Sequence, residues 1–207
     1  MDYIFFDTET TSIKPGQIGQ LAYIIQTANN EITGKNHYFE VAHVESDAAA
    51  VTGMDTDFYR QASGGIKFAD KAIEISEDFS NKLAVAHNIK FDTNFINIEM
   101  FRADIYFNMQ KTFDTMVFFR DICKIPSTNR KYGAFKNPKL VEVVRSLNID
   151  EEKVARYSEK IFNIPSGSFH NAMYDTTALL VAFNVYREIH NGICGYWRDT
   201  FVRKGAY

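Results

Sequence analysis

Short apolar runs and stretches of helical periodicity alternate along the chain. The apolar runs, most of them rich in aromatic or β-branched residues, predict strands over residues 3–7, 19–28, 36–41, 82–88 and 111–115. Apolar residues spaced three to four apart predict helices over residues 66–82, 91–103, 116–122, 136–149 and 171–190. Turn signals alone separate the first three strands, which predicts an antiparallel meander, whereas helices separate the later strands. The pattern therefore predicts an α/β domain with a five-stranded mixed sheet, a three-strand antiparallel meander plus parallel strands, flanked by helices.

The composition is that of one folded domain. The chain has 207 residues, of which 45% are hydrophobic, and this is enough for a full core. A net charge of −3 gives no whole-molecule support for nucleic-acid binding, so such binding must rest on local patches. Two isolated cysteines, Cys123 and Cys194, favour a reducing compartment without disulfides. There is no signal-peptide pattern and no apolar run long enough to span a bilayer, so we expect a cytoplasmic protein without a membrane segment.

Carboxylates follow the apolar runs at points that a sheet would bring together. Asp7 and Glu9 lie two residues apart at the end of the first strand, so their side chains share one face. Asp92 follows the fourth strand, and Asp175 lies in the first turns of the last helix. Strand ends and helix starts meet at one edge of an open α/β sheet, where ligands bind. Neighbouring carboxylates suit Mg²⁺ or Mn²⁺, and His170, just before the last helix, is placed to face the same cleft.

Each of these residues also has a structural interpretation. Asp7 alone suits a surface or capping position, and a lone histidine at a helix start is more often structural than catalytic. Asp92 and Asp175 suit the positive N-terminal ends of their helices. These structural interpretations explain the acids less well when the acids are taken together. Asp7 and Glu9 have no basic partner nearby in the sequence, and like charges raise each other's pKa. A divalent cation resolves that conflict.

Three segments carry a resemblance to a known family. FFDTET, AHNIKFD and FHNAMYD, in this order and at these separations, resemble the three motifs of the DEDD 3′–5′ exonucleases, the DnaQ-like superfamily that includes polymerase III epsilon-type proofreading enzymes. His170 and Asp175 have the spacing of the histidine branch, DEDDh, whereas the tyrosine branch would have Tyr where this chain has Asn171. A minor departure is GQLAY in the second strand, where relatives often carry an acid that is not a ligand. The resemblance implies a ribonuclease H-like fold, with an exonuclease domain over residues 1–190 and an extension of unassigned role over residues 191–207.

The resemblance also implies the chemistry. Four acidic side chains would hold two Mg²⁺ ions, for which Mn²⁺ substitutes: Asp7, Glu9, Asp92 and Asp175. Asp7 would bridge both ions, and Asp92 would act partly through water. His170 would be the general base that takes a proton from the attacking water. The products would be 5′-mononucleotides, released from single-stranded or frayed 3′ ends of DNA, with RNA as the alternative substrate.

The same resemblance implies contacts with the substrate. Thr8 and Thr10 would meet the terminal nucleotide, and Met54, in VTGM, would pack on the last base. Asn88 and Phe91, which flank the second motif, would touch the sugar-phosphate and the base. For Met54 and Phe91, ordinary core packing is the alternative interpretation. Stacking on aromatic rings tolerates any base, so we expect little sequence preference.

Two further stretches mix basic and aromatic residues. Residues 124–139 carry five Lys or Arg and no acid, interleaved with Tyr132 and Phe135, which suits either a loop that binds a nucleic-acid backbone or an ordinary solvated loop. The tail YWRDTFVRKGAY either packs on the domain or docks on a partner. Two models of assembly stay open: a chain that works alone, or one that works with a polymerase or another replication or repair protein. Self-association is open as well.

Two other functional classes compete with the exonuclease hypothesis. FFDTETT superficially resembles the DxDxT signature of haloacid dehalogenase-like phosphatases, but that class needs Asp at position 9 and leaves the other two motifs unexplained. A catalytically silent nucleic-acid-binding or scaffold module with the same fold would be favoured by loss of any metal ligand. All four acids and His170 are present, so the sequence favours an enzyme.

Overall fold

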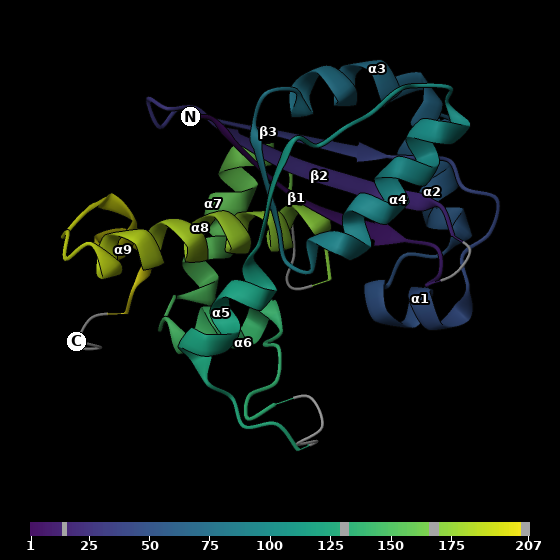
Figure 1. Cartoon of the computed structure of the whole chain (residues 1–207). Helices are drawn as coiled ribbons and strands as arrows, with labels where there is room; N and C mark the ends of the chain where they lie inside the picture. The colour runs from purple at the N-terminus through teal and green to yellow at the C-terminus, as the bar shows by residue number, and fades with distance from the viewer. Residues whose placement is uncertain (14–15, 129–132, 166–169, 204–207) are drawn as a thin grey trace.

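The fold is built on one five-stranded sheet. The computed structural model of the chain describes residues 1–13, 16–128, 133–165 and 170–203 (Figure 1). The strands are β1 (Tyr3–Thr10), β2 (Ile18–Gln26), β3 (Ile32–Tyr38), β4 (Leu83–Ala86) and β5 (Lys111–Asp114), in the spatial order β3-β2-β1-β4-β5. β1, β2 and β3 pair antiparallel, whereas β1, β4 and β5 pair parallel. The predicted mixed sheet, with its three-strand meander, is confirmed.

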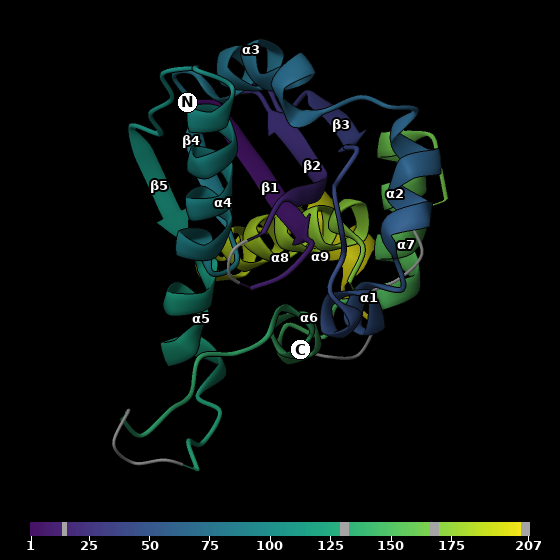
Figure 2. The ribbon, with the colours of Figure 1, turned by 90° about the vertical axis from the view of Figure 1, so that its right-hand side faces the viewer.

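Helices cover both faces of the sheet, as Figure 2 shows. α3 (Phe68–Phe79) and α4 (Ile89–Arg102) pack on one face, and α8 (Ala172–His190) lies across the other. The central strand β1 contributes side chains to the apolar cores on both faces of the sheet, because its side chains alternate between the faces. Phe5 packs with α8, while Ile4 and Phe6 pack with α3 and α4, and all three side chains are fully buried. The aromatic run near the start of the chain thus joins the two cores.

The remaining helices surround these layers. They are α1 (Ser46–Thr52), α2 (Thr56–Ser63), α5 (Thr115–Cys123), α6 (Leu140–Ser146), α7 (Glu151–Phe162) and α9 (Tyr196–Phe201). α1, α2, α7 and α9 had no counterpart among the predicted elements. In α9, Trp197 and Phe201 are buried in the same apolar cluster as α8, so the described part of the tail packs on the domain. Among the described helices, none has the length and apolar character needed to cross a membrane.

Two strands have boundaries that differ from the prediction. β3 covers Ile32–Tyr38 rather than residues 36–41, because most of its residues are polar and half-buried and carry no apolar signal. β1 continues to Thr10, so Asp7 and Glu9 lie within the strand rather than at its end. The antiparallel register with β2 is interrupted between Glu9 and Thr10. Both acids are therefore held by regular strand geometry.

Helix α6 is shorter than predicted. It covers Leu140–Ser146 instead of residues 136–149, so Pro138 lies outside the helix. The Lys139 N–H donates to the Glu142 side chain at 2.7 Å, an arrangement that fixes a helix start at this point. At the other end Asn148 has a φ of 52°, which a continuing helix does not allow.

Candidate active site

Three carboxylates converge where β1 passes beneath the start of α8. Asp7 and Glu9 come from β1, and Asp175 comes from the first turn of α8. One carboxylate oxygen of each lies within 4.8 Å of the others. The Thr176 hydroxyl donates to the Ala22 carbonyl at 3.2 Å, and Ala22 is the cross-strand partner of Asp7, so α8 is fixed over this point of the sheet. The structure thus brings together three residues that the sequence places in one site.

Asp92 is held beside these carboxylates by β1 itself. Its side chain, on α4, is only 3% exposed. Its Oδ1 accepts two hydrogen bonds from Thr8, from the backbone N–H at 3.1 Å and from the hydroxyl at 2.7 Å. Thr8 lies between Asp7 and Glu9, so its side chain points to the opposite face of the strand. The strand β1 therefore carries two of the acids and orients a third. The motif resemblance implies that Thr8 contacts the nucleotide, and it does not predict the contact of Thr8 with Asp92.

Burial raises the pKa of all four acids, and neighbouring carboxylates raise it further. The pKa of Asp7 lies well above its usual value because of burial and then the charges of the three other carboxylates. Burial, and then the charges of Asp175 and Asp92, raises the pKa of Glu9 to about 8. Burial raises the pKa of Asp175 to about 7 despite a hydrogen bond from His170, and that of Asp92 to about 7 despite the bonds it accepts. A bound cation would therefore favour ionisation of the cluster near neutral pH.

The residues fit a divalent cation better than a basic side chain. The ion pairs of the described residues involve none of the four acids. Asp175 Oδ1 is buried without a hydrogen-bond partner, one of only two such side-chain atoms in the described part of the chain. A donor set made only of carboxylate oxygens suits Mg²⁺ or Mn²⁺ rather than a softer metal. The unpartnered oxygen is thus available to a cation.

His170 lies at the turn that leads into α8. The backbone N–H of His170 donates to Asp175 Oδ2 at 3.1 Å, and the φ of His170 is 70°, in the left-handed region. The next residue, Asn171, is the N-cap of α8 and accepts a hydrogen bond from the Met173 N–H at 3.1 Å. Residues other than glycine adopt such a backbone at an energetic cost, and these conformations cluster at functional sites. The turn therefore couples an exposed histidine to one of the clustered acids.

Two of the residues predicted to contact substrate are packed against other apolar side chains. Met54 is 5% exposed and lies in a small cluster that includes Val44 and Tyr59. Phe91 is half-buried, and its ring centroid lies 4.9 Å from that of Phe95. Both side chains therefore have ordinary core packing, the alternative to a base contact, and Phe91 retains an exposed part.

The other two candidates for substrate contact, Asn88 and Thr10, lie next to strand ends. Asn88 is the N-cap of α4 in a left-handed conformation, and its N–H donates to Asp114 Oδ1 at 3.2 Å. Asp114 also caps α5. The Thr10 hydroxyl donates to the Ser12 carbonyl at 3.1 Å. Asp114 at the end of β5 thus joins the starts of α4 and α5, whereas Thr10 bonds into the loop after β1.

Two tyrosines near Glu9 have no counterpart in the sequence prediction. Tyr59 is 1% exposed, its hydroxyl has no hydrogen-bond partner, and burial and then the charge of Glu9 raise its pKa. Its ring lies against Gly19, where an added Cβ would come within 2.4 Å, and the adjacent Gln20 pairs with Glu9. The ring of Tyr38 lies 6.4 Å from that of Tyr59. The only sequence signal for this contact is a glycine inside an apolar strand.

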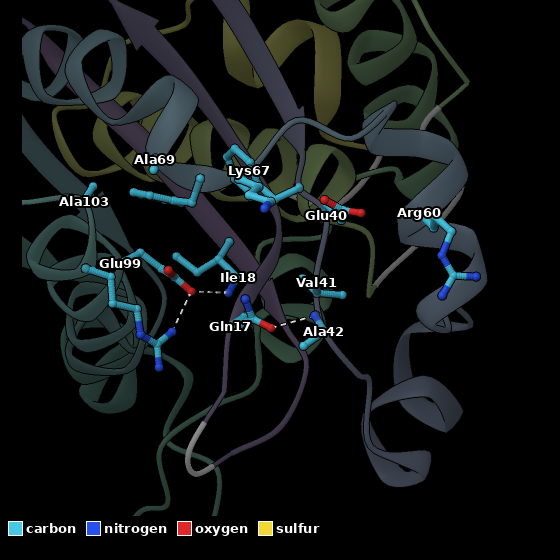
Figure 3. A pocket seen from close by; sticks show the side chains of 13 residues that line it. Gln17, Ile18, Glu40, Val41, Ala42, Arg60, Lys67, Ala69, Glu99 and Ala103 are labelled. Atoms are coloured by element: carbon cyan, nitrogen blue, oxygen red, sulfur yellow. Dashed lines mark hydrogen bonds and ion pairs between the residues drawn. The ribbon is translucent and has the colours of Figure 1, made fainter.

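A separate cavity of about 570 Å³ lies on the α3 and α4 side of the sheet (Figure 3). Within its lining, Glu99 Oε1 accepts hydrogen bonds from Arg102 at 3.0 Å and from the Ile18 N–H at 3.3 Å. The Gln17 side chain accepts from the Ala42 N–H at 2.8 Å. None of the four clustered acids lines this cavity, so it is distinct from the carboxylate site.

Removing the Thr8 hydroxyl is expected to weaken cation binding about 10-fold. In Thr8→Val, Asp92 loses a hydrogen bond of 2.7 Å, and partners that orient a ligating carboxylate typically contribute 10- to 100-fold to affinity. The measurement is a calorimetric titration of the metal-free protein with Mn²⁺. Thr8→Ser keeps the hydroxyl and is the matched control, with wild-type affinity expected. Equal affinities of wild type and Thr8→Val would contradict the orienting contact.

The fold and the carboxylates together define a class of protein. A mixed five-stranded sheet with clustered acids from β1 and α8, and a further acid from α4 bonded to β1, is the arrangement of ribonuclease H-like nucleases. The family model described as Exonuclease (RNase_T) matches residues 4–183, so the chain belongs to this exonuclease family. The resemblance of the three motifs to the DEDDh 3′–5′ exonucleases is thereby confirmed. A comparison with curated proteins found no match.

Solved structures of E. coli exonuclease I share the fold. The complex with a dT13 oligonucleotide has 17% sequence identity and a TM-score of 0.65, over 92% of this chain and 42% of that chain. The zinc-bound form of the E. coli ExoI–ssDNA complex has 17% identity and a TM-score of 0.64, over 96% of this chain and 42% of that chain. The chain thus spans less than half the length of these proteins. At such identity the similarity shows the fold alone.

Proposed function

We propose that the protein is a divalent-cation-dependent 3′–5′ exonuclease that removes 5′-mononucleotides from 3′ ends, of DNA in the first place and of RNA as the alternative. One observation carries the proposal. Oxygens of Asp7, Glu9 and Asp175 lie within 4.8 Å of one another in a chain of the exonuclease family, and one of these residues has an unpartnered buried oxygen. Buried carboxylates without compensation are costly, so a bound cation accounts for this cluster.

The four acids would hold two cations. Glu9 and Asp175 would hold the ion that activates the attacking water, Asp7 would serve both ions, and Asp92 would contribute partly through water. When bound, the ions supply a clamp on the scissile phosphate and stabilise the negative charge that develops on it. Thr8 keeps Asp92 oriented through its two hydrogen bonds. Mg²⁺ is the proposed ion, with Mn²⁺ as a substitute.

His170 would move the proton. The attacking water gives a proton to the imidazole as its oxygen bonds to phosphorus, and the bond from phosphorus to the 3′ oxygen of the preceding nucleotide breaks. That leaving oxygen takes up a proton. The products are a 5′-mononucleotide and a strand shorter by one nucleotide with a new 3′ hydroxyl. The exposed position of His170 allows it to return its proton to solvent before the next cycle.

Single-stranded DNA is the substrate to which the comparisons point first. The E. coli exonuclease I structures contain oligonucleotides of dT and dA, and this supports testing DNA before RNA. We propose that Thr8 and Thr10 contact the terminal nucleotide and that Met54 packs on the last base. Asn88 and Phe91 would contact the sugar-phosphate and the base. Another similar structure is an ExoI/SSB-Ct complex, which supports testing for a protein partner. We propose a replication or repair protein, for example a polymerase, as that partner.

A comparison of linear with circular DNA tests the proposed function. Linear single-stranded DNA should release 5′-mononucleotides in Mg²⁺, detected by chromatography, whereas circular single-stranded DNA, which has no end, should stay intact. A 3′-phosphate should slow release, and an RNA of the same sequence should be cleaved more slowly. Cleavage of the circle, or release from the 5′ end, would contradict an exonuclease of this polarity. Binding of the linear DNA without cleavage in either Mg²⁺ or Mn²⁺ would favour the catalytically silent module.

A further inference from the structure

A paired arm projects from the domain between α5 and α6. Its described stem, residues 124–128 and 133–139, is antiparallel, with a bridge between Pro126 and Phe135. The Ser127 N–H donates to the Ala134 carbonyl at 3.0 Å, and a second 3.0 Å bond joins the two sides nearer the base. Figures 1 and 2 both show the arm extending away from the body of the molecule. We call this stem the basic arm; residues 129–132, with Arg130, Lys131 and Tyr132, lie outside the described residues.

The root of the basic arm is tied to the catalytic edge of the sheet. His87 Nε2 lies 2.9 Å from the Pro138 carbonyl, and its Nδ1 lies 3.1 Å from the Thr115 hydroxyl at the start of α5. The strand β4 pairs parallel with β1. His87 lies in the turn from β4 to α4, and the first turn of α4 carries Asp92, which accepts the two hydrogen bonds from Thr8. The arm is therefore held at the end of β4, by a residue five positions along the chain from Asp92.

The charge of the arm contrasts with that of the rest of the chain. Residues 124–139 carry five basic residues and no acid, and three of the five, Lys124, Lys136 and Lys139, lie in the described stem. The net charge of the protein is −3, so the rest of the chain carries −8. Of the described cations, Lys124 and Lys139 are exposed, whereas Lys136 pairs with Glu142 at 2.6 Å. Phosphate chains are attracted by local basic patches even where the whole protein is acidic. The arm therefore offers such a patch, tied to the end of β4.

We infer that the basic arm binds the sugar-phosphate backbone of the strand on the 5′ side of the nucleotide being removed. The inference rests on the proposed function, because it assigns a path to that substrate. It also explains how an acidic protein retains a polyanion at a cluster of four carboxylates. Backbone contacts of this kind carry no base information, so the arm contributes affinity rather than sequence preference.

Reversing the charges of Lys124 and Lys139 is expected to impair cleavage of a long substrate but not of a short one. The variant is Lys124→Glu/Lys139→Glu, and the control with the same change in charge is Lys111→Glu/Lys160→Glu, at exposed residues of β5 and α7. Each is assayed on single-stranded DNA of 20 nucleotides and on the p-nitrophenyl ester of thymidine 5′-phosphate, which is too short to reach the arm. Thermal melting confirms that both variants are folded.

The arm variant should raise KM for the 20-nucleotide strand at least about 10-fold and leave the ester unchanged within about twofold. Two lost phosphate contacts should also lower the slope of log KM against log salt by about 1.4, at about 0.7 per contact for single strands. The control variant should match wild type on both substrates. An unchanged KM for the long strand, or equal losses on both substrates, would overturn the inference.

A wild-type protein that cleaves neither substrate would contradict the proposed function without deciding the role of the arm. Fluorescence anisotropy of the 5′-labelled strand in EDTA then makes the decision. Weaker binding by the arm variant than by the control would support the arm as a nucleic-acid surface. Equal binding by the two would overturn it and leave an acidic protein partner as the occupant to test.

Discussion

Replacing Asp7 with Asn is expected to lower 3′-end cleavage at least about 10³-fold while making the metal-free protein more stable. Asp7 is half-buried, and burial and then the charges of the three other acids raise its pKa. The substitution removes the ligand proposed to be shared by both cations. Such ions contribute several kcal/mol to phosphoryl chemistry, and about 1.4 kcal/mol is a tenfold change in rate. The same loss of charge relieves repulsion, so melting in EDTA at about pH 8 should occur a few degrees higher.

Asp121→Asn is the matched control for this result. Asp121 lies exposed on α5 beside Arg120, with which it forms an ion pair at 3.1 Å. Its replacement should leave both the cleavage rate and the melting temperature close to wild type. An Asp7→Asn protein that keeps more than about a tenth of the activity would contradict the proposed ligand. A lower melting temperature in EDTA would show that Asp7 stabilises the fold.

In EDTA, the wild type should lose stability relative to the double variant Asp7→Asn/Glu9→Gln as the pH rises from about 5 to about 8. In the unfolded chain the two acids have ordinary pKa values of 3.8 and 4.5, whereas in the folded protein the pKa of Glu9 is about 8 and that of Asp7 is also raised. The unfolded chain therefore loses its protons first, and stability present at low pH is lost as pH rises toward the folded pKa. Since one pKa unit corresponds to about 1.4 kcal/mol, the relative fall in melting temperature should reach several degrees.

The comparison with the double variant isolates the cluster from other titrating groups. Burial lowers the pKa of His37 and His87, so these histidines make stability rise with pH over part of the same pH range. This contribution is the same in the wild type and in the double variant. Mg²⁺ should raise the wild-type melting temperature more at about pH 8 than at about pH 6, because its binding then displaces fewer protons. A wild type that becomes more stable than the variant as pH rises would contradict the raised pKa values.

The sequence predicts the centre of this fold because its signals there agree. The aromatic run before Asp7 predicts a buried strand, and Ile4, Phe5 and Phe6 are fully buried in β1. Asp7, Glu9 and Asp175, separated by up to 168 positions, belong to a strand and a helix with clear apolar patterns. The topology of an open α/β sheet alone therefore predicts that they meet at one edge of the sheet. The placement of His170 before the last helix follows from the same pattern.

Elements that depend on contacts from elsewhere are harder to predict. β3 is an edge strand whose polar residues face solvent or other polar groups, as when Lys35 pairs with Glu74 and Asp78. Its Gly34 is required because Ile161 of α7 comes so close that an added Cβ would lie within 2.3 Å. Neither α7 nor the need for this glycine is visible until the two segments are packed together.

The same holds for the partners of the catalytic candidates. The hydrogen bond from Thr8 to Asp92 joins positions 84 residues apart, and no local sequence pattern predicts it. The tie between His87 and the Pro138 carbonyl joins the second motif to the basic arm across 51 residues. Motif spacing therefore predicts which residues carry the chemistry, whereas the residues that orient them emerge only from tertiary contacts.

Incubation of a 5′-labelled single-stranded DNA with the protein, in Mg²⁺ or in EDTA, tests most directly whether the four acids and His170 form a cation-dependent site acting on 3′ ends. The account predicts a ladder that shortens from the 3′ end by single nucleotides in Mg²⁺, is absent in EDTA, and is lost or strongly reduced in Asp7→Asn and His170→Ala. Full-length DNA in every lane, with binding to the protein demonstrated separately, would contradict it and indicate a module that binds nucleic acid without cleaving it.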